Sequence, residues 1–179
     1  MADKIYRINM TDLSATTEDV PQDWAGYGGR GLTSTIIAAE VDPACHPLGP
    51  NNKLVIAPGL LSGTPAANSG RISVGAKSPL TGTIKESNAG GTAAQLLAKC
   101  GCKAIIIEGQ PAEGKWYNIA ITPSSVTINE ETELIGKGNF ATAEALQKRF
   151  EKKRGVISIG PAGEMKMAAA NISVQDPNY

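Results

Sequence analysis

The sequence is poor in aromatic residues and has no long hydrophobic run. Phe, Tyr and Trp together make up 4% of the 179 residues, whereas glycine alone occurs 20 times. This composition disfavours a helical bundle with a large aromatic core, and it favours a loop-rich domain whose backbone segments approach closely. No run of 18 apolar residues is present, so we expect no transmembrane helix. The first ten residues carry charges in place of an apolar stretch, so we expect a soluble, cytoplasmic protein without a secretory signal.

An excess of charge of one sign is also absent. The chain has 17 Lys and Arg residues and 17 Asp and Glu residues, which gives a formal net charge of zero. Nothing in this balance favours nucleic acid or an acidic membrane surface as a partner, and we expect neither. The length suits one domain with its own core better than two, so we expect a single domain over residues 1–179.

Cysteine is scarce, and no familiar catalytic motif is present. The three cysteines, Cys45, Cys100 and Cys102, are an odd number, which argues against a disulfide framework. Together with His46 they could supply four metal ligands, but the C-x-C spacing is tighter than that of zinc sites, and small buried hydrophobes are the favoured interpretation. The chain also lacks H-E-x-x-H, C-x-x-C and G-x-S-x-G sequences, so neither a zinc protease nor a serine hydrolase is indicated.

What the chain does contain is a series of short periodic segments. Alternating or continuous apolar residues predict strands at 6–10, 15–20, 54–57, 71–77, 83–87, 104–107, 115–121, 125–129, 155–159 and 168–174. Helical spacing predicts helices at 32–41, 92–99 and 140–153. In the last helix we expect four inward residues, Phe140, Ala143, Leu146 and Phe150, and four solvated ones, Lys148, Arg149, Lys152 and Lys153.

A weak internal repeat is visible in the sequence. Residues 54–59 (LVIAPG) resemble residues 156–161 (VISIGP), and residues 66–74 resemble residues 168–174. After the first copy come a glycine-led helix and the strand at 104–108, whereas the second copy has no such continuation before Tyr179. This pattern indicates a duplicated β-rich half-domain whose second copy continues beyond this chain, with a chance likeness as the alternative.

The most informative stretch is residues 58–91, in which Gly-rich loops alternate with short strands. Arg71 and Asn88 stand beside glycines, where a ligand can approach the backbone because no Cβ intervenes. A guanidinium such as that of Arg71 can hold a pair of phosphate oxygens, with a solvated strand-edge arginine as the alternative. Asn88, followed by Gly90 and Gly91 at a predicted helix start, resembles a helix N-terminal anion site, with a simple N-cap as the alternative.

Two further positions follow the same reasoning. Residues 28–31 (GGRG), which include Arg30, precede a predicted helix, but they do not form the G-x-G-x-x-G of a dinucleotide site. Lys77, at the end of a predicted strand, could neutralise a phosphate, although a solvated lysine is the favoured alternative. We assign no catalytic residue, and the candidate cofactor-binding residues are Arg30, Arg71, Lys77, Asn88, Gly90 and Gly91.

Six motifs occur in an order that is similar to a known family. They are GGRGL at 28–32, NKLVIAPG at 52–59, GR at 70–71, KSPLTG at 77–82, SNAGG at 87–91 and IGPAGE at 159–164. In this order and spacing, from about Arg7 to Asn171, the chain resembles the N-terminal domain of the tungsten-containing aldehyde ferredoxin oxidoreductases.

The resemblance implies a fold, a cofactor and a reaction. Family members oxidise aldehydes to carboxylates and pass electrons through an iron–sulfur cluster to ferredoxin. Their tungsten, or molybdenum in some relatives, is held by two pterins, and the N-terminal domain forms a β-rich base under them without ligating the metal. The arginine at the position of Arg71 and the Asn-x-Gly at Asn88 and Gly90 contact this tungstopterin (or molybdopterin). We therefore expect an α+β fold of two mostly antiparallel sheets with a few short packed helices.

The chain also departs from the family pattern. It lacks a second Arg/Gly-rich pterin loop and the C-x-x-C-x-x-x-C motif, so the four-iron four-sulfur cluster belongs to missing domains. We expect these 179 residues alone to be inactive, to dock on the remaining domains through exposed apolar surface, and to form homo-oligomers when isolated. The alternatives are a stand-alone pterin- or phosphate-binding or assembly subunit without redox activity, and a structural domain that has lost its site.

Overall fold

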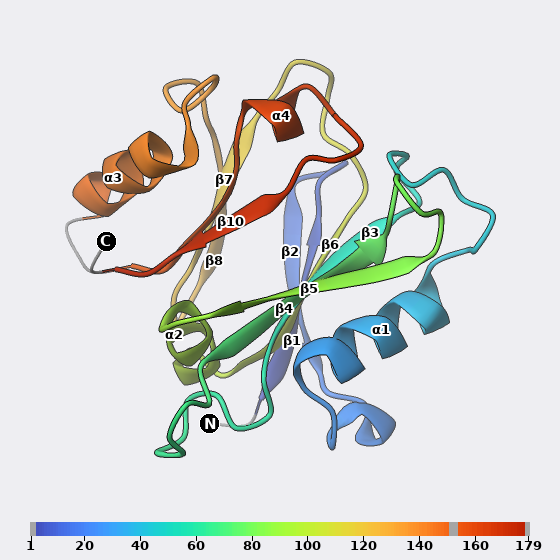
Figure 1. Cartoon of the computed structure of the whole chain (residues 1–179), viewed down its shortest axis with the longest axis vertical. Coiled ribbons are helices and arrows are strands. Elements are labelled where there is room, and N and C mark those ends of the chain that lie inside the picture. The colour runs from blue at the N-terminus through green and yellow to red at the C-terminus, as the bar shows by residue number, and fades with distance from the viewer. Residues whose placement is uncertain (1–2, 151–153, 178–179) are drawn as a thin grey trace.

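The computed structural model describes residues 3–150 and 154–177, and its centre is a six-stranded sheet (Figure 1). Its strands, in the spatial order β2-β1-β6-β3-β4-β5, are β2 (Ser14–Asp19), β1 (Lys4–Asn9), β6 (Cys102–Glu108), β3 (Lys53–Pro58), β4 (Arg71–Lys77) and β5 (Ile84–Gly90). All neighbours are antiparallel except β1 and β6, which run parallel. The parallel pair is possible because the long connection from β1 to β6 contains all the other elements of this sheet.

One face of the sheet is covered by helix α1 (Gly29–Glu40), which a short 3-10 helix, η1 (Gln22–Trp24), precedes. Helical spacing places Leu32, Ile36 and Ile37 on the inner side of α1, where all three are buried. They pack against residues of the sheet, including Ile5, Val55, Ala57, Ala104 and Ile106.

The opposite face carries a second layer made of smaller pieces. It contains helix α2 (Ala93–Lys99) and two separate two-stranded sheets, β7 (Tyr117–Ile121) with β8 (Val126–Glu130) and β9 (Val156–Ile159) with β10 (Ile172–Gln175). Helix α3 (Asn139–Arg149) packs on β9, and the short helix α4 (Pro161–Glu164) follows it (Figure 1). Because both faces of the central sheet are covered, β6 has the continuous apolar run of residues 104–107.

These observations confirm the predicted α+β class with mostly antiparallel pairing and few short helices. The second layer, however, consists of two pairs of strands in place of one continuous sheet. Three local predictions were wrong. The last strand begins at Ile172 and not at Ala168, and β5 continues to Gly90. Phe140 is 82% exposed, because it lies in the first turn of α3, where none of the described residues covers it. Lys152 and Lys153 lie outside the described residues.

A network of charged side chains fixes the C-terminal end of α1 to the sheet. The guanidinium of Arg7 donates to Glu18 (2.7 Å), Glu40 (2.9 Å) and Glu108 (3.2 Å), and Lys53 bridges Glu40 and Glu108. The hydrogen bonds to Glu40 and Glu18 raise the pKa of Arg7. Burial would raise the pKa of Glu40, but the hydrogen bonds from Arg7 and Lys53 outweigh this effect and hold it below its ordinary value.

Glu131 has a similar role in the second layer, where it joins the β7–β8 pair to α3. Its carboxylate accepts from Arg149 of α3 at 2.6 Å and from the amide of Asn118 of β7 at 2.8 Å. The hydrogen bond from Arg149 is the main cause that lowers the pKa of Glu131 to about 2, against the effect of burial.

None of the helices within the described residues has the length and apolar character needed to cross a lipid bilayer.

We predict that Glu131→Gln destabilises the protein at neutral pH by about 1–3 kcal/mol, because it removes a charged hydrogen-bond acceptor. The folded-state pKa of about 2 lies below the ordinary value of 4.5, so the stabilisation is complete above pH 4.5 and is lost as the pH falls toward 2. Urea titrations at pH 7, 4 and 3 should therefore show a wild-type advantage that shrinks with acidification. The control is Glu130→Gln, whose exposed ion pair with Lys115 should contribute little. An advantage that does not change with pH would contradict the assignment.

Candidate functional site

The candidate site lies on the α1 face of the central sheet, where β3 ends, β4 begins and β5 ends. In the β4–β5 ladder, Arg71 lies opposite Gly90 and Ser73 lies opposite Asn88. Because side chains alternate along a strand, Arg71, Ser73 and Asn88 belong to the same face, and Ile72 belongs to the other. The sheet thus brings together Arg71, Asn88 and Gly90, which the sequence analysis had singled out in two separate motifs.

The start of α1 comes very close to these strands. A Cβ added to Gly28 would lie 2.4 Å from the backbone nitrogen of Leu60, in the loop that follows β3. A Cβ added to Gly29, which has a φ of +53°, would lie 3.2 Å from the hydroxyl oxygen of Ser73. Only glycine at position 28 allows this approach of two backbone segments, and it places the helix terminus directly beside the β4–β5 residues.

The N-terminus of α1 has no cap of its own. Its N-cap residue is Gly28, which has no side chain, and the described part of the chain offers no acceptor to the N–H groups of Gly29, Arg30 and Gly31. These N–H groups and the positive end of the helix dipole favour a negatively charged group at this place.

Two arginines and an amide surround the helix start. The guanidinium of Arg71 lies over Gly90, where a Cβ would be 3.8 Å from its Nη1 atom, and it is exposed. The side chain of Arg30 is 69% exposed, and its Nε atom lies 3.7 Å from the carboxylate of Glu86. The amide of Asn88 donates to that carboxylate at 2.8 Å and accepts from the Ser73 hydroxyl at 2.5 Å. The site therefore presents donors from the backbone, from two cations and from neutral groups, with one carboxylate at its edge.

Lys77 lies apart from these residues, at the far end of β4. Its ammonium group is buried and donates to the carbonyl oxygens of Pro43 (2.6 Å) and Cys45 (2.5 Å). Contact with a phosphate would require Lys77 to give up these two hydrogen bonds, so the structure gives it a role in holding the loop at 42–47.

The start of α2 is already occupied by a side chain of the protein. The carboxylate of Asp176 accepts from the N–H groups of Thr92 (2.8 Å) and Ala93 (3.1 Å). Gly91 has a φ of +117°, and a Cβ there would lie 2.5 Å from this carboxylate. The interpretation of Asn88 as part of an anion site at this helix was therefore wrong in its geometry, as was the N-cap alternative, since Asn88 lies in β5. No local pattern indicates this role of Asp176, which is 85 residues from Gly91 along the chain.

The cysteines are distributed over the two faces of the sheet. Cys45 packs against the α1-side core, and Cys102 is buried in the core on the opposite side, where burial raises the pKa of its thiol. Within residues 3–150 and 154–177, no three His, Cys, Asp or Glu side chains are placed to share a metal ion.

Comparison with known proteins gives one consistent family. The family model described as "Aldehyde ferredoxin oxidoreductase, N-terminal domain" matches residues 5–179. The chain is 39% identical over 171 residues to the tungsten-containing aldehyde ferredoxin oxidoreductase of Thermococcus kodakarensis, and 37% identical over 171 residues to that of Pyrococcus furiosus. Each alignment covers 93% of this chain and 28% of the relative, so the chain spans little more than a quarter of these proteins.

A solved structure shares the fold. It is the active site complex BamBC of benzoyl coenzyme A reductase with 1,5-dienoyl-CoA, which matches with a TM-score of 0.89 and 32% identity. The match covers 96% of this chain and 26% of the other.

We predict that Gly28→Ala destabilises the protein by about 1–3 kcal/mol, because the added methyl group would collide with the backbone of Leu60 and move α1 away from β4. Denaturant unfolding of the two forms measures this difference. The matched control is Gly26→Ala, two residues earlier, where a Cβ would meet nothing within 4 Å and the stability should change by less than about 0.5 kcal/mol. Equal stability of the two variants would show that the close approach is not required.

Proposed function

Because the chain belongs to the aldehyde ferredoxin oxidoreductase N-terminal domain family, we propose that it is the cofactor-binding domain of a longer oxidoreductase. In this proposal residues 1–179 form one domain that binds a tungstopterin and has no activity alone. The complete protein oxidises an aldehyde to a carboxylate. An iron–sulfur cluster in its other domains passes the electrons to ferredoxin, in the cytoplasm.

The observation that carries this proposal is the uncapped start of α1 beside Arg71. A pterin cofactor of this type carries phosphate, and a phosphate is the kind of group that free helix N–H groups and a guanidinium bind together. Gly28 lets the helix start lie against the backbone of Leu60, and Gly90 leaves the surface beside the Arg71 guanidinium free of a Cβ atom. The donor set therefore fits an anionic cofactor.

The residues of this chain would bind and orient the cofactor. Arg71 and the N–H groups of Gly29 to Gly31 hold the anionic part, and Asn88, itself fixed by Ser73 and Glu86, supplies neutral hydrogen bonds. Arg30, held near Glu86, closes the side of the site. The bound tungsten, or molybdenum, supplies the two-electron redox chemistry, and none of these side chains needs to ligate it.

The partners follow from the same proposal. Several large apolar side chains are exposed at places where further domains of the protein could dock, among them Leu60, Leu80, Phe140, Met165 and Met167. Isolated residues 1–179 would then self-associate through these side chains.

We predict that Arg71→Ala in the complete protein lowers the tungsten and pterin content several-fold, because the anionic group loses its bidentate partner. Arg71→Lys should restore part of the content, since it keeps the charge but not the planar fork. Metal analysis by mass spectrometry together with pterin fluorescence measures both quantities.

The control for this experiment is Lys85→Ala, an exposed cation of β5 whose side chain belongs to the opposite face of the sheet. Its tungsten content should equal that of the wild type. Full tungsten and pterin content in Arg71→Ala, with the fold intact by circular dichroism, would contradict the proposed site and favour a domain in which this surface has only a structural role.

A further inference from the structure

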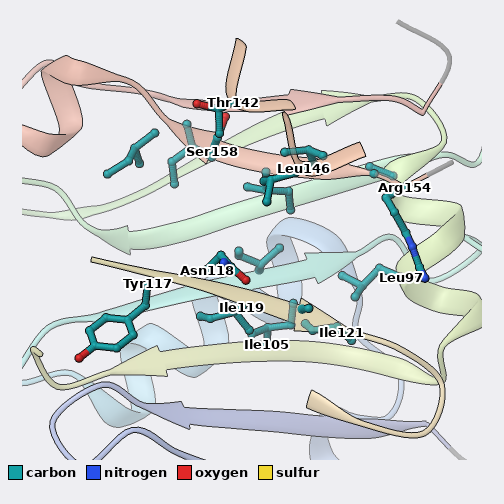
Figure 2. A pocket seen from close by; sticks show the side chains of 18 of the residues that line it. Leu97, Ile105, Tyr117, Asn118, Ile119, Ile121, Thr142, Leu146, Arg154 and Ser158 are labelled. Atoms are coloured by element: carbon teal, nitrogen blue, oxygen red, sulfur yellow. The ribbon is translucent and has the colours of Figure 1, made fainter. Parts of the chain in front are cut away.

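Helix α2 lies between the second layer and the loop that leads into Arg71. On its second-layer side is an apolar cavity of about 680 Å³, which residues of β7 and β9 also line. Leu97 of α2 and Ile105 of β6 both belong to the wall of this cavity (Figure 2). The first turn of α2, in contrast, contacts the chain segments that precede Arg71. The helix therefore connects the second layer with the surroundings of the candidate site.

The backbone beside the Arg71–Gly90 pair is closely packed. Gly91 donates its N–H to the carbonyl oxygen of Gly70 at 3.0 Å, which continues the β4–β5 ladder beyond Arg71. A Cβ added to Gly70 would overlap the carbonyl oxygen of Gly91, and it would lie 3.5 Å from the Cγ atom of Gln95. The backbone that carries Arg71 therefore rests on Gly91 and on the first turn of α2.

Gln95 of α2 holds the loop between β3 and β4, residues 59–70. Its amide nitrogen donates to the Ser69 hydroxyl at 3.0 Å, and its amide oxygen accepts from the N–H of Gly63. The buried hydroxyl of Ser62, in the same loop, donates to the carbonyl oxygen of Ser69 at 2.7 Å. Because an amide is a donor and an acceptor at once, this single side chain attaches two places of the loop to α2.

Asp176 holds the start of the same helix from the second layer. Its Oδ1 atom accepts from the N–H groups of Thr92 and Ala93. Both carboxylate oxygens lie against Gly91, where a Cβ would be 2.5 Å from one and 2.7 Å from the other. Asp176 follows β10, whereas Gly91 follows β5, so this contact joins the second layer to the end of the central sheet.

We propose that Asp176 and Gln95 are positioning residues of the cofactor site, which fix the backbone around Arg71 and so hold its guanidinium in place. The inference rests on the proposed function, because it takes Arg71 to bind the anionic part of the cofactor. Donors that are already held in the binding geometry lose less entropy when the ligand arrives, so a fixed backbone raises the affinity. Neither of the two side chains needs to touch the cofactor.

The same contacts extend to the start of α1. The loop at 59–70 carries Leu60 near its beginning, where Gly28 packs against its backbone, and it ends directly before Arg71. By holding this loop, Gln95 fixes the helix N–H groups and the guanidinium relative to each other. Because Asp176 follows β10, the site is complete only when the second layer has formed.

The tungsten and pterin content of the complete protein tests the role of Asp176. We expect Asp176→Ala to lower both several-fold, because the start of α2 loses its cap. Asp176→Asn should restore most of the content, since Asn keeps the oxygen acceptor and caps helices as well as Asp does. The control is Glu131→Gln, which weakens the contact of β7 with α3. A loss no larger in Asp176→Ala than in this control, or no rescue by Asn, would overturn the proposal.

Gln95→Ala in the complete protein should lower the tungsten content in the same way, because the loop at 59–70 loses both hydrogen bonds to α2. The matched control is Lys99→Ala, an exposed residue of the same helix, which should keep the content of the wild type. Equal tungsten contents in these two variants would overturn the assignment of Gln95.

A double-mutant cycle separates positioning from a general loss of stability. If Asp176 acts through Arg71, Asp176→Ala lowers the tungsten content of the wild type and has no further effect in Arg71→Ala. An equal fold-loss in both backgrounds would overturn the proposal. Full tungsten content in Arg71→Ala would overturn the proposed function and this inference with it. A loss in Arg71→Ala without a loss in Asp176→Ala would overturn this inference alone.

Discussion

The close approach between the start of α1 and the strands β3 and β4 is the contact on which the candidate site depends. The backbone at Gly28 lies against Leu60 with no room for a Cβ, and Gly29 lies against Ser73. This contact places helix N–H groups, which have no acceptor among residues 3–150 and 154–177, next to Arg71 and Asn88. The buried face of α1 and the ion pairs of Arg7 and Glu40 hold the rest of the helix on the same sheet. The surface to which we assign the cofactor thus results from packing in which no described side chain caps the helix.

The two faces of the central sheet have different characters. The α1 side is closed by one long helix and presents polar and charged groups at its end. The other side has an apolar cavity between two pairs of strands. Since the chain covers little more than a quarter of its relatives, we relate this second side to the rest of the complete protein, and we relate the first side to the cofactor.

Local signals in the sequence were sufficient for most strands and helices, and the Gly-rich motifs singled out Arg71 and Asn88 as separate candidates, which the β4–β5 pairing brings together. Long-range contacts were not accessible in this way. The carboxylate of Asp176 occupies the start of α2, where the sequence analysis predicts an anion site. Lys77 donates hydrogen bonds to two backbone carbonyl groups of a loop more than 30 residues earlier in the chain. Phe140 fits an amphipathic pattern, but it lies in the first turn of α3, where the described residues do not cover it. Hydrophobic periodicity predicts which face of a helix points inward, but it does not predict how far the neighbouring layer extends along that face.

The most direct test of the central claim is an experimental structure of the complete protein with its metal cofactor bound. The account predicts an anionic group of the cofactor within hydrogen-bonding distance of the N–H groups of Gly29 to Gly31 and of the Arg71 guanidinium. A cofactor bound on the opposite face of the sheet, with the start of α1 and Arg71 in contact with solvent or with another domain only, would contradict it.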